Sequence, residues 1–153
     1  MKALIVSPFY PPEIGGISNH VEQLATRLAS RRWDVRVITC SRKQMVDRRY
    51  SNLKVERVRA IYLPQWPLQT LASFSVPIGF SKKLLKCVSD FEPDLVHLHG
   101  HHYPITWLGA ALAHSRKVPT LLTLHGLYAL NPYRPHGRSF VEEVFNRTIL
   151  HEY

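Results

Sequence analysis

Histidine is concentrated in the segment HLHGHH, where four imidazoles stand within six residues. In an extended chain His97 and His99 point to the same side, and His101 and His102 follow in the next turn. Such a group could bind zinc, because imidazole is the commonest nitrogen ligand of that metal. No carboxylate or thiolate completes an obvious catalytic zinc set, so we predict no metal here. We interpret the four histidines as the lining of a polar cleft that binds hydroxyl-rich or phosphorylated ligands.

His125 follows the apolar run PTLLTL and precedes Gly126, so a polar side chain interrupts a series of leucines. A histidine in this position can be a core residue whose ring nitrogens are satisfied by hydrogen bonds. At the carboxyl end of a strand, however, a neutral imidazole can orient a hydroxyl group, act as a base or hold a charged group. We therefore predict that His125 is a catalytic residue.

Two adjacent glycines, Gly15 and Gly16, separate an apolar run from a helical pattern in PPEIGGISNH. Backbone N–H groups at the start of a helix, with the helix dipole behind them, form a binding site for phosphate or carboxylate. The spacing matches neither G-x-G-x-x-G nor the P-loop, which argues against those two classes of nucleotide site. A tight turn without a ligand is the alternative. We predict that both glycines approach a phosphate.

Alternating strand and helix patterns position these residues. Short β-branched or apolar runs predict strands, and apolar spacing of three and four residues predicts helices, with Asn19 and Glu22 resembling a capping box. The expected strands are Ala3–Phe9, Asp34–Cys40, Leu53–Arg59, Asp94–Gly100 and Pro119–Gly126, and the expected helices are Asn19–Arg31, Ser81–Asp90, Pro104–Ser115 and Ser139–Tyr153. Loops are expected between Cys40 and Leu53, over Ala60–Phe80 and over Leu127–Arg138.

This alternation indicates an α/β protein with a doubly wound, Rossmann-like parallel sheet and helices on both faces. We expect one domain over residues 1–153. Ligands of such sheets bind beyond the carboxyl ends of the strands. The glycine pair, the HLHGHH group and His125 each follow a different predicted strand, so we expect them to converge on one site.

Composition limits the classes that remain. The chain is 45% hydrophobic, carries no apolar run of membrane-spanning length and begins without a signal-peptide pattern, so we expect a cytoplasmic protein. Cys40 and Cys87 lack the spacing of a zinc or redox motif and are expected to be buried thiols. A formal net charge of +9 favours an anionic partner. We expect no nucleic acid, because the chain has neither a basic recognition helix nor a stacking motif.

The excess of basic residues accompanies an unusually apolar loop. The basic residues are Arg42, Lys43, Arg48, Arg49, Lys54, Arg57, Arg59, Lys82, Lys83 and Lys86, and the apolar ones are Trp66, Leu68, Leu71 and Phe74. Aromatic and basic side chains favour the interface of an anionic membrane. Peripheral membrane attachment and packing of the loop on its own domain are both open interpretations.

Four motifs together resemble a known family. PFYPPEIGGISNHVEQLATRL, DVRVITC, PDLVHLHG and VPTLLTLHG occur in the order and spacing of the N-terminal, acceptor-side domain of family-4 retaining GT-B glycosyltransferases. The resemblance implies a nucleotide-sugar donor, a saccharide or lipid-linked acceptor and no metal cofactor. It also implies that Gly15 and Gly16 approach the donor phosphates, and that His125 lies near the reacting sugar.

Two departures from the family pattern matter. Arg32-Trp33 stands where the family usually has Gly-His. The basic pair and the two glutamates that the family's second domain uses to hold the nucleotide are missing from these residues. We therefore expect an incomplete glycosyltransferase that needs a second domain or a partner chain for activity. A fragment, a subunit of a split enzyme, a truncated copy and a non-catalytic sugar- or phosphate-binding domain are the alternatives.

Overall fold

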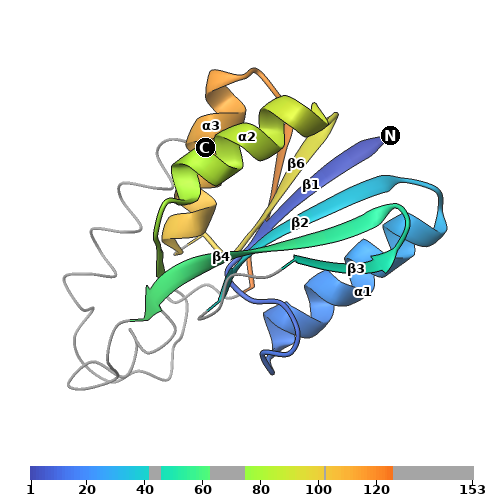
Figure 1. Cartoon of the computed structure of the whole chain (residues 1–153), viewed down its shortest axis with the longest axis horizontal. Coiled ribbons are helices and arrows are strands. Elements are labelled where there is room, and N and C mark those ends of the chain that lie inside the picture. The colour runs from blue at the N-terminus through green and yellow to red at the C-terminus, as the bar shows by residue number, and fades with distance from the viewer. Residues whose placement is uncertain (42–45, 63–74, 102, 126–153) are drawn as a thin grey trace.

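The computed structural model describes residues 1–41, 46–62, 75–101 and 103–125. Strands and helices alternate along most of this chain (Figure 1). In chain order the elements are β1 (Lys2–Ser7), α1 (Gly16–Ser30), β2 (Asp34–Ser41), β3 (Val46–Tyr50), β4 (Leu53–Tyr62), β5 (Ser75–Pro77), α2 (Phe80–Phe91), β6 (Leu95–His99), α3 (Pro104–Ser115) and β7 (Thr120–Thr123). No helix in these ranges is long and apolar enough to cross a membrane.

The described strands form one seven-stranded sheet in the order β3-β4-β2-β1-β6-β7, with β5 paired to β4. The five strands β4, β2, β1, β6 and β7 are parallel, as the alternation of patterns predicts. Their carboxyl ends therefore meet at a common edge. The strand order changes direction at β1, so the loop after β1 lies beside the end of β6.

Helices cover both faces of the sheet, which confirms the doubly wound prediction. Helix α1 lies on one side, and α2 and α3 lie on the other (Figure 1). Alternate residues of β1 serve the two cores: Leu4 and Val6 join the cluster under α2 and α3, and Ile5 joins the cluster under α1. All three side chains are fully buried, so β1 is the apolar centre of the molecule.

Two antiparallel strands correct the prediction of an all-parallel sheet with loops after β2 and β4. Strand β3 pairs with β4 across a short hairpin, and β5 pairs with the extended end of β4. Both strands are short and join the β4 edge, where pairing satisfies backbone groups without requiring a regular apolar pattern. The sequence VDRRY is too charged to predict a strand by itself.

The start of α1 also differs from the prediction. The helix begins at Gly16 with Gly15 as its N-cap, and no side chain caps it. Asn19 already lies inside the first turn, where its N–H donates to the carbonyl oxygen of Gly15 at 3.0 Å. The capping-box interpretation of Asn19 and Glu22 is therefore wrong, because the backbone of the glycine pair itself begins the helix.

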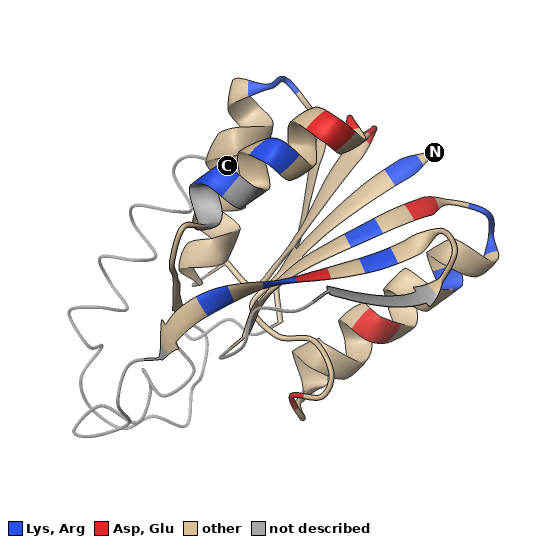
Figure 2. Cartoon of the chain, in the orientation of Figure 1, with Lys and Arg blue, Asp and Glu red and all other residues tan. Residues whose placement is uncertain are grey.

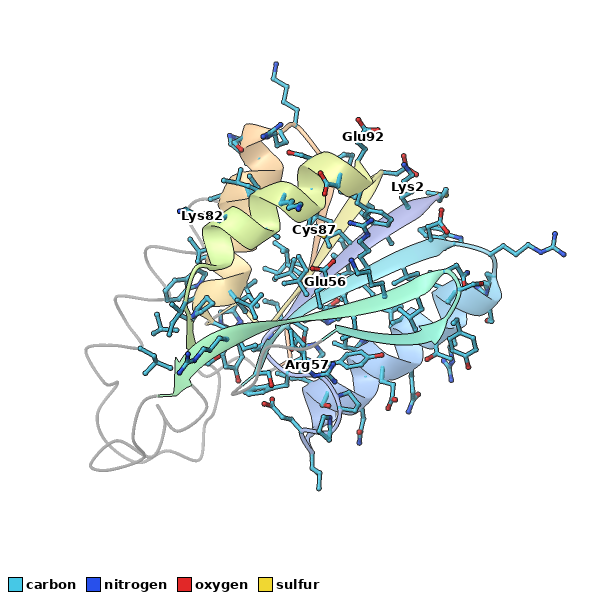
Figure 3. The ribbon with its side chains drawn as sticks, in the orientation of Figure 1. Lys2, Glu56, Arg57, Lys82, Cys87 and Glu92 are labelled. Atoms are coloured by element: carbon cyan, nitrogen blue, oxygen red, sulfur yellow. The ribbon has the colours of Figure 1, made fainter. Side chains whose placement is uncertain are left out.

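Among the basic residues whose side chains the structure describes, not all lie on one exposed surface as the sequence indicates. In the described chain, Lys and Arg are spread over the sheet and several helices (Figure 2). Arg57 is buried: its guanidinium donates to the backbone oxygen of Pro11 and lies 5.8 Å from the ring centre of Tyr10. Lys54 pairs with Glu56 at 2.7 Å on the same strand, β4, where Figure 3 labels Glu56 and Arg57. Both of these basic side chains therefore interact with groups of the same chain.

The structure confirms the prediction for the two cysteines, but it does not describe the residues of the apolar loop or of the last predicted helix. Cys40 and Cys87 are free buried thiols, as expected, and burial raises the pKa of Cys40 to about 11. The apolar residues Trp66, Leu68, Leu71 and Phe74, together with the predicted loop and helix over Leu127–Tyr153, lie outside the described residues.

The turn after α1 uses arginine where the family pattern has glycine. Arg32 adopts a φ of 65°, in the left-handed region that favours glycine. The side-chain amide of Asn52 stabilises the turn by donating to the carbonyl oxygens of Ala29 and Trp33, each at 2.8 Å. Asn52 therefore stabilises a turn in which Arg32 has a backbone conformation that is unfavourable for arginine.

Replacing Arg32 by glycine should stabilise the chain. The left-handed conformation costs a residue with a Cβ about 1–2 kcal/mol, and glycine loses about 0.5–1 kcal/mol of extra entropy on folding. We expect a net gain of roughly 0.5–1 kcal/mol in the free energy of unfolding, measured by urea denaturation. Arg31→Gly is the matched control, since Arg31 has a φ of −88° and should gain nothing. A loss of stability in Arg32→Gly would contradict the prediction.

Candidate functional site

The histidines of β6 lie on the α1 face of the sheet. Val96 and Leu98 point into the core under α2 and α3, so the alternation of the strand turns His97 and His99 to the opposite face. In register with His97 on the neighbouring strand lies Ile5, which belongs to the apolar core under α1. The polar site therefore directly adjoins that core, and both imidazoles are buried.

Two hydrogen bonds connect the histidines of β6 to the last residue of β7 and to His125, two positions beyond it. Nε2 of His97 lies 2.7 Å from Oγ1 of Thr123, and Nδ1 of His99 lies 2.9 Å from Nε2 of His125. His97 is paired in register with Leu121, and His99 with Thr123. Each histidine of β6 thus reaches a residue two positions beyond its backbone partner. The parallel pairing of the strands sets both contacts.

A fourth imidazole, that of His20, completes a histidine cluster that we define as His20, His97, His99 and His125. The ring centre of His20 lies 5.5 Å from that of His99 and 5.2 Å from that of His125. The rings of His97 and His99 are stacked with centres 4.3 Å apart. His20 is exposed on α1. The sequence analysis missed it, although its position four residues after Gly16 places it one helical turn beyond the glycine pair.

Burial keeps the inner histidines uncharged. Desolvation is the largest cause in every case: together with the neighbouring imidazoles, it lowers the pKa of His97 to about 4 and that of His99 to about 3. The pKa of His125 is also lowered, by burial and then by His20. Neutral imidazoles each carry one N–H donor and one bare nitrogen. The cluster therefore offers hydrogen bonds at neutral pH rather than positive charge.

The other histidines of HLHGHH have different places. His101 is buried, burial lowers its pKa, and its carbonyl oxygen accepts a hydrogen bond from Nε1 of Trp107 at 2.6 Å. It adjoins the start of α3, and none of the ring contacts that define the cluster involves it. His102 lies outside the described residues. Within the described ranges, no three side chains are grouped so as to hold a metal ion.

The glycine pair adjoins the cluster through the first turns of α1. A Cβ at Gly15 or at Gly16 would meet no atom within 4 Å, and neither residue lies in the left-handed region, since Gly15 is extended with a φ of 165°. Packing within the described chain therefore does not explain these glycines. Gly109, by contrast, has Leu98 and Val6 within 3.2 Å of its hypothetical Cβ. The uncapped helix start is exposed, and its N–H groups can receive an anion.

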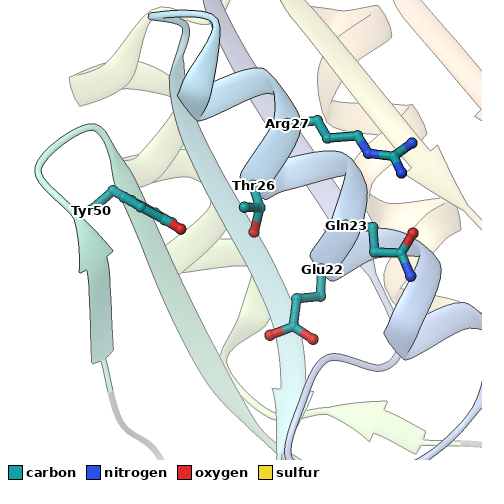
Figure 4. A pocket seen from close by; sticks show the side chains of 5 residues that line it. All are labelled: Glu22, Gln23, Thr26, Arg27 and Tyr50. Carbon is teal, nitrogen blue, oxygen red and sulfur yellow. The ribbon is translucent and has the colours of Figure 1, made fainter.

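A separate pocket lies between α1 and the end of β3. It has a volume of about 560 Å³ and is lined by Glu22, Gln23, Thr26, Arg27 and Tyr50 (Figure 4). None of these residues belongs to the histidine cluster. The lining mixes one acidic and one basic side chain, so it does not indicate one class of ligand.

Comparison with known proteins identifies the family. The family described as Glycosyltransferase Family 4 matches residues 14–150, a range that begins one residue before the glycine pair and includes every member of the histidine cluster. The chain belongs to glycosyltransferase family 4. This confirms the resemblance that the four sequence motifs indicate.

Relatives of this family 4 chain are longer proteins. It is 32% identical over 130 residues to an uncharacterized glycosyltransferase of Methanocaldococcus jannaschii, a match that covers 85% of this chain and 33% of that protein. It is 34% identical over 148 residues to a glycogen synthase of Mycobacterium tuberculosis, which covers 84% and 34% respectively. The chain thus spans about a third of the length of these curated relatives.

A solved structure supports the fold. The UDP-GlcNAc 2-epimerase of Neisseria meningitidis matches with a TM-score of 0.51 at 19% identity, over 99% of this chain and 43% of the epimerase. At that identity the likeness concerns the fold alone. The family 4 chain therefore has the Rossmann-like architecture of one half of a GT-B protein.

The stability of the family 4 chain should fall steeply in mild acid. Histidines have an ordinary pKa near 6.5 in the unfolded chain, and those of His97 and His99 are about 4 and about 3 when folded. The free energy of unfolding is therefore highest above about pH 6.5 and decreases as pH falls toward 4, because in this range the unfolded state binds more protons than the folded state. Each of the two residues contributes a slope of up to about 1.4 kcal/mol per pH unit.

Urea unfolding at several pH values measures this slope. His97→Gln and His99→Gln should each flatten it, because glutamine does not titrate in this range. His114→Gln is the matched control: His114 is exposed on α3, and its replacement leaves the buried cluster intact. If the dependence of stability on pH is unchanged in both His97→Gln and His99→Gln, the prediction that these two buried histidines cause it is wrong.

Proposed function

We propose that this chain is the acceptor-side half of a retaining glycosyltransferase that transfers a sugar from a nucleotide sugar to a hydroxyl group. The observation that carries the proposal is the meeting of the uncapped glycine start of α1 with the histidine cluster at one edge of the sheet. One part suits a phosphate and the other suits sugar hydroxyls. Membership of family 4 supports the same chemistry.

The glycine start of α1 and the histidine cluster would have different roles in the reaction. The bond between the anomeric carbon and the diphosphate breaks, and the diphosphate leaves with the electron pair. The acceptor oxygen forms the new bond to the anomeric carbon, and its proton passes to an oxygen of the leaving diphosphate. The N–H groups after Gly15 would stabilise charge on the leaving diphosphate, and His125 would hold the reacting sugar by a hydrogen bond. No metal is required by this scheme.

A second half should complete the active site. This chain covers only about a third of the length of its curated relatives, and the donor nucleotide needs positive groups that the described site does not supply. We infer that a second GT-B domain, on a partner chain or a longer form of the protein, holds most of the nucleotide. The chain by itself should not transfer sugar.

Calorimetric titration with a panel of nucleoside diphosphate sugars tests the proposal. We expect heat of binding and transfer when a family 4 donor-binding half is added, and none with the chain by itself. Gly16→Val should weaken binding by the mixture about tenfold or more, because a side chain would occupy the phosphate approach, while its Cβ would meet no atom of the chain within 4 Å.

Ala111→Val is the matched control for Gly16→Val. Ala111 is exposed on α3, so the substitution adds bulk away from the proposed site and should leave binding unchanged. Unchanged binding by Gly16→Val would show that the glycines form only a turn. No binding by any mixture would favour a non-catalytic or truncated domain instead.

We further propose an anionic membrane, facing the cytoplasm, as the surface on which a lipid-linked acceptor is met. Ile61 is paired in register with Val76, and the N–H of Ile78 donates to the carbonyl oxygen of Arg59 at 2.8 Å. These four residues share one face of the β4–β5 ribbon, and all are exposed, whereas Ala60 between them is buried. The ribbon thus presents an apolar strip.

Three exposed basic residues lie on this strip or on the next element of the chain, which favours an anionic surface over a neutral one. Arg59 lies on the strip itself, and Lys82 and Lys86 are exposed on α2, the next element in the chain. The acidic residues of this region, Asp90 and Glu92, are at the far end of α2. Apolar side chains with basic neighbours bind the headgroup region of anionic lipids.

Cosedimentation with phospholipid vesicles tests this surface. We expect binding to phosphatidylglycerol–phosphatidylcholine vesicles and little binding to phosphatidylcholine alone. Replacing Ile61, Val76 and Ile78 by serine should weaken binding at least about tenfold, since each side chain loses apolar burial. Leu108→Ser is the control, because Leu108 is a similarly exposed apolar residue on α3. Equal binding to both vesicle types would contradict the proposal.

A further inference from the structure

The hydrogen bond between the two histidines leaves a ring nitrogen of His99 without a partner. Nδ1 of His99 contacts Nε2 of His125 at 2.9 Å, whereas Nε2 of His99 is buried and has no hydrogen-bond partner among the described residues. His99 itself is 0% exposed. Bulk water therefore does not reach this nitrogen in the folded chain, and its protonation state affects the stability of the pair.

Two arrangements of the protons are possible. If His125 donates through Nε2–H, neutral His99 must carry its own proton on Nε2, where a buried N–H has no acceptor. If His99 donates through Nδ1–H, its Nε2 is bare, and His125 carries its proton on Nδ1. In protein backbones, buried N–H groups without an acceptor are rarer than carbonyl groups that lack a donor, and we extend this preference to the ring nitrogens of His99. The second arrangement is therefore the favoured one.

We propose that His99 is a positioning residue that donates its Nδ1 proton to Nε2 of His125 and so presents Nδ1–H of His125 as a donor to a ligand oxygen. Because Nε2 of His125 is occupied, Nδ1 is the nitrogen that remains for a ligand. His125 is only partly buried, in contrast to His99. That the oxygen belongs to a sugar rests on the proposed function.

The backbone around His99 holds its ring in place. The carbonyl oxygen of His99 accepts a hydrogen bond from Oγ1 of Thr106 at 2.9 Å, and the N–H of Gly100 donates to the carbonyl oxygen of Thr123 at 3.0 Å. The ring is stacked on that of His97. Contacts from α3, from β7 and from its own strand thus hold the Nδ1–H donor of His99 in place, as a positioning group requires.

Burial keeps the donor uncharged over the range in which the protein works. The pKa of His99 is about 3, chiefly because of desolvation, so a neutral ring with a single proton persists well below neutral pH. The titratable groups in ring contact with the pair are His20 from α1 and His97 from β6. A neutral donor selects one tautomer of His125 without adding a charge to the site.

Nitrogen NMR of the chain with labelled histidine tests the proposal directly. Long-range spectra show which ring nitrogen of each histidine bears the proton, and single histidine variants assign the signals. At about pH 8, above the ordinary histidine pKa, we expect the proton on Nδ1 in both His99 and His125. A proton on Nε2 of His125 would overturn the proposal.

Three variants separate positioning from a purely structural role. His99→Asn keeps an N–H donor near the place of Nδ1, so His125 should remain protonated on Nδ1. His99→Phe keeps an aromatic ring without a donor, and the proton of His125 should move to Nε2. Thr123→Val breaks the neighbouring hydrogen bond to His97 and should leave His125 unchanged. An unchanged tautomer in His99→Phe would overturn the proposal even where the wild-type spectrum agrees.

This experiment does not depend on sugar transfer. If the NMR result is as expected but no nucleotide sugar binds any mixture, the proposed function fails and the positioning of His125 stands. If nucleotide sugars bind and His125 is protonated on Nε2, the positioning of His125 by His99 fails and the proposed function stands. The two conclusions can therefore be separated.

Discussion

The parallel pairing of β6 with β7 is the constraint on which the candidate site depends. Its register places His99 opposite Thr123, and from there each histidine of β6 reaches a residue two positions further on. The pairing of β6 with β1 then brings the loop before α1 to the same edge of the sheet. A shift of one residue in either register would turn these imidazoles into the apolar core under α2 and α3.

The site combines a rigid interior with an open entrance. His97 and His99 are buried, neutral and hydrogen-bonded across strands, whereas His20 and the glycine pair are exposed. Of the inner pair, His99 is hydrogen-bonded to the partly exposed His125, and the exposed groups can meet a ligand. Such a division suits an enzyme domain that must hold a donor group still and yet close on a second half.

Several elements could be predicted because their signals are local. The helix Pro104–Ser115 has the predicted bounds, and the five parallel strands occur where β-branched and apolar runs indicate them. Strands β3 and β5 could not be predicted, since their stability comes from pairing with β4 rather than from their own residues. Arg57 was expected at a surface, but its burial depends on a backbone oxygen 46 residues away.

The sequence by itself determined the α/β class, the family and three of the four members of the histidine cluster. These follow from residue types and their spacing along the chain. Only the tertiary structure decided that His20 joins them, that His99 bonds to His125, and that both glycines face open space. Such facts depend on distances between segments that are far apart in sequence, and those distances are set by strand register and helix packing.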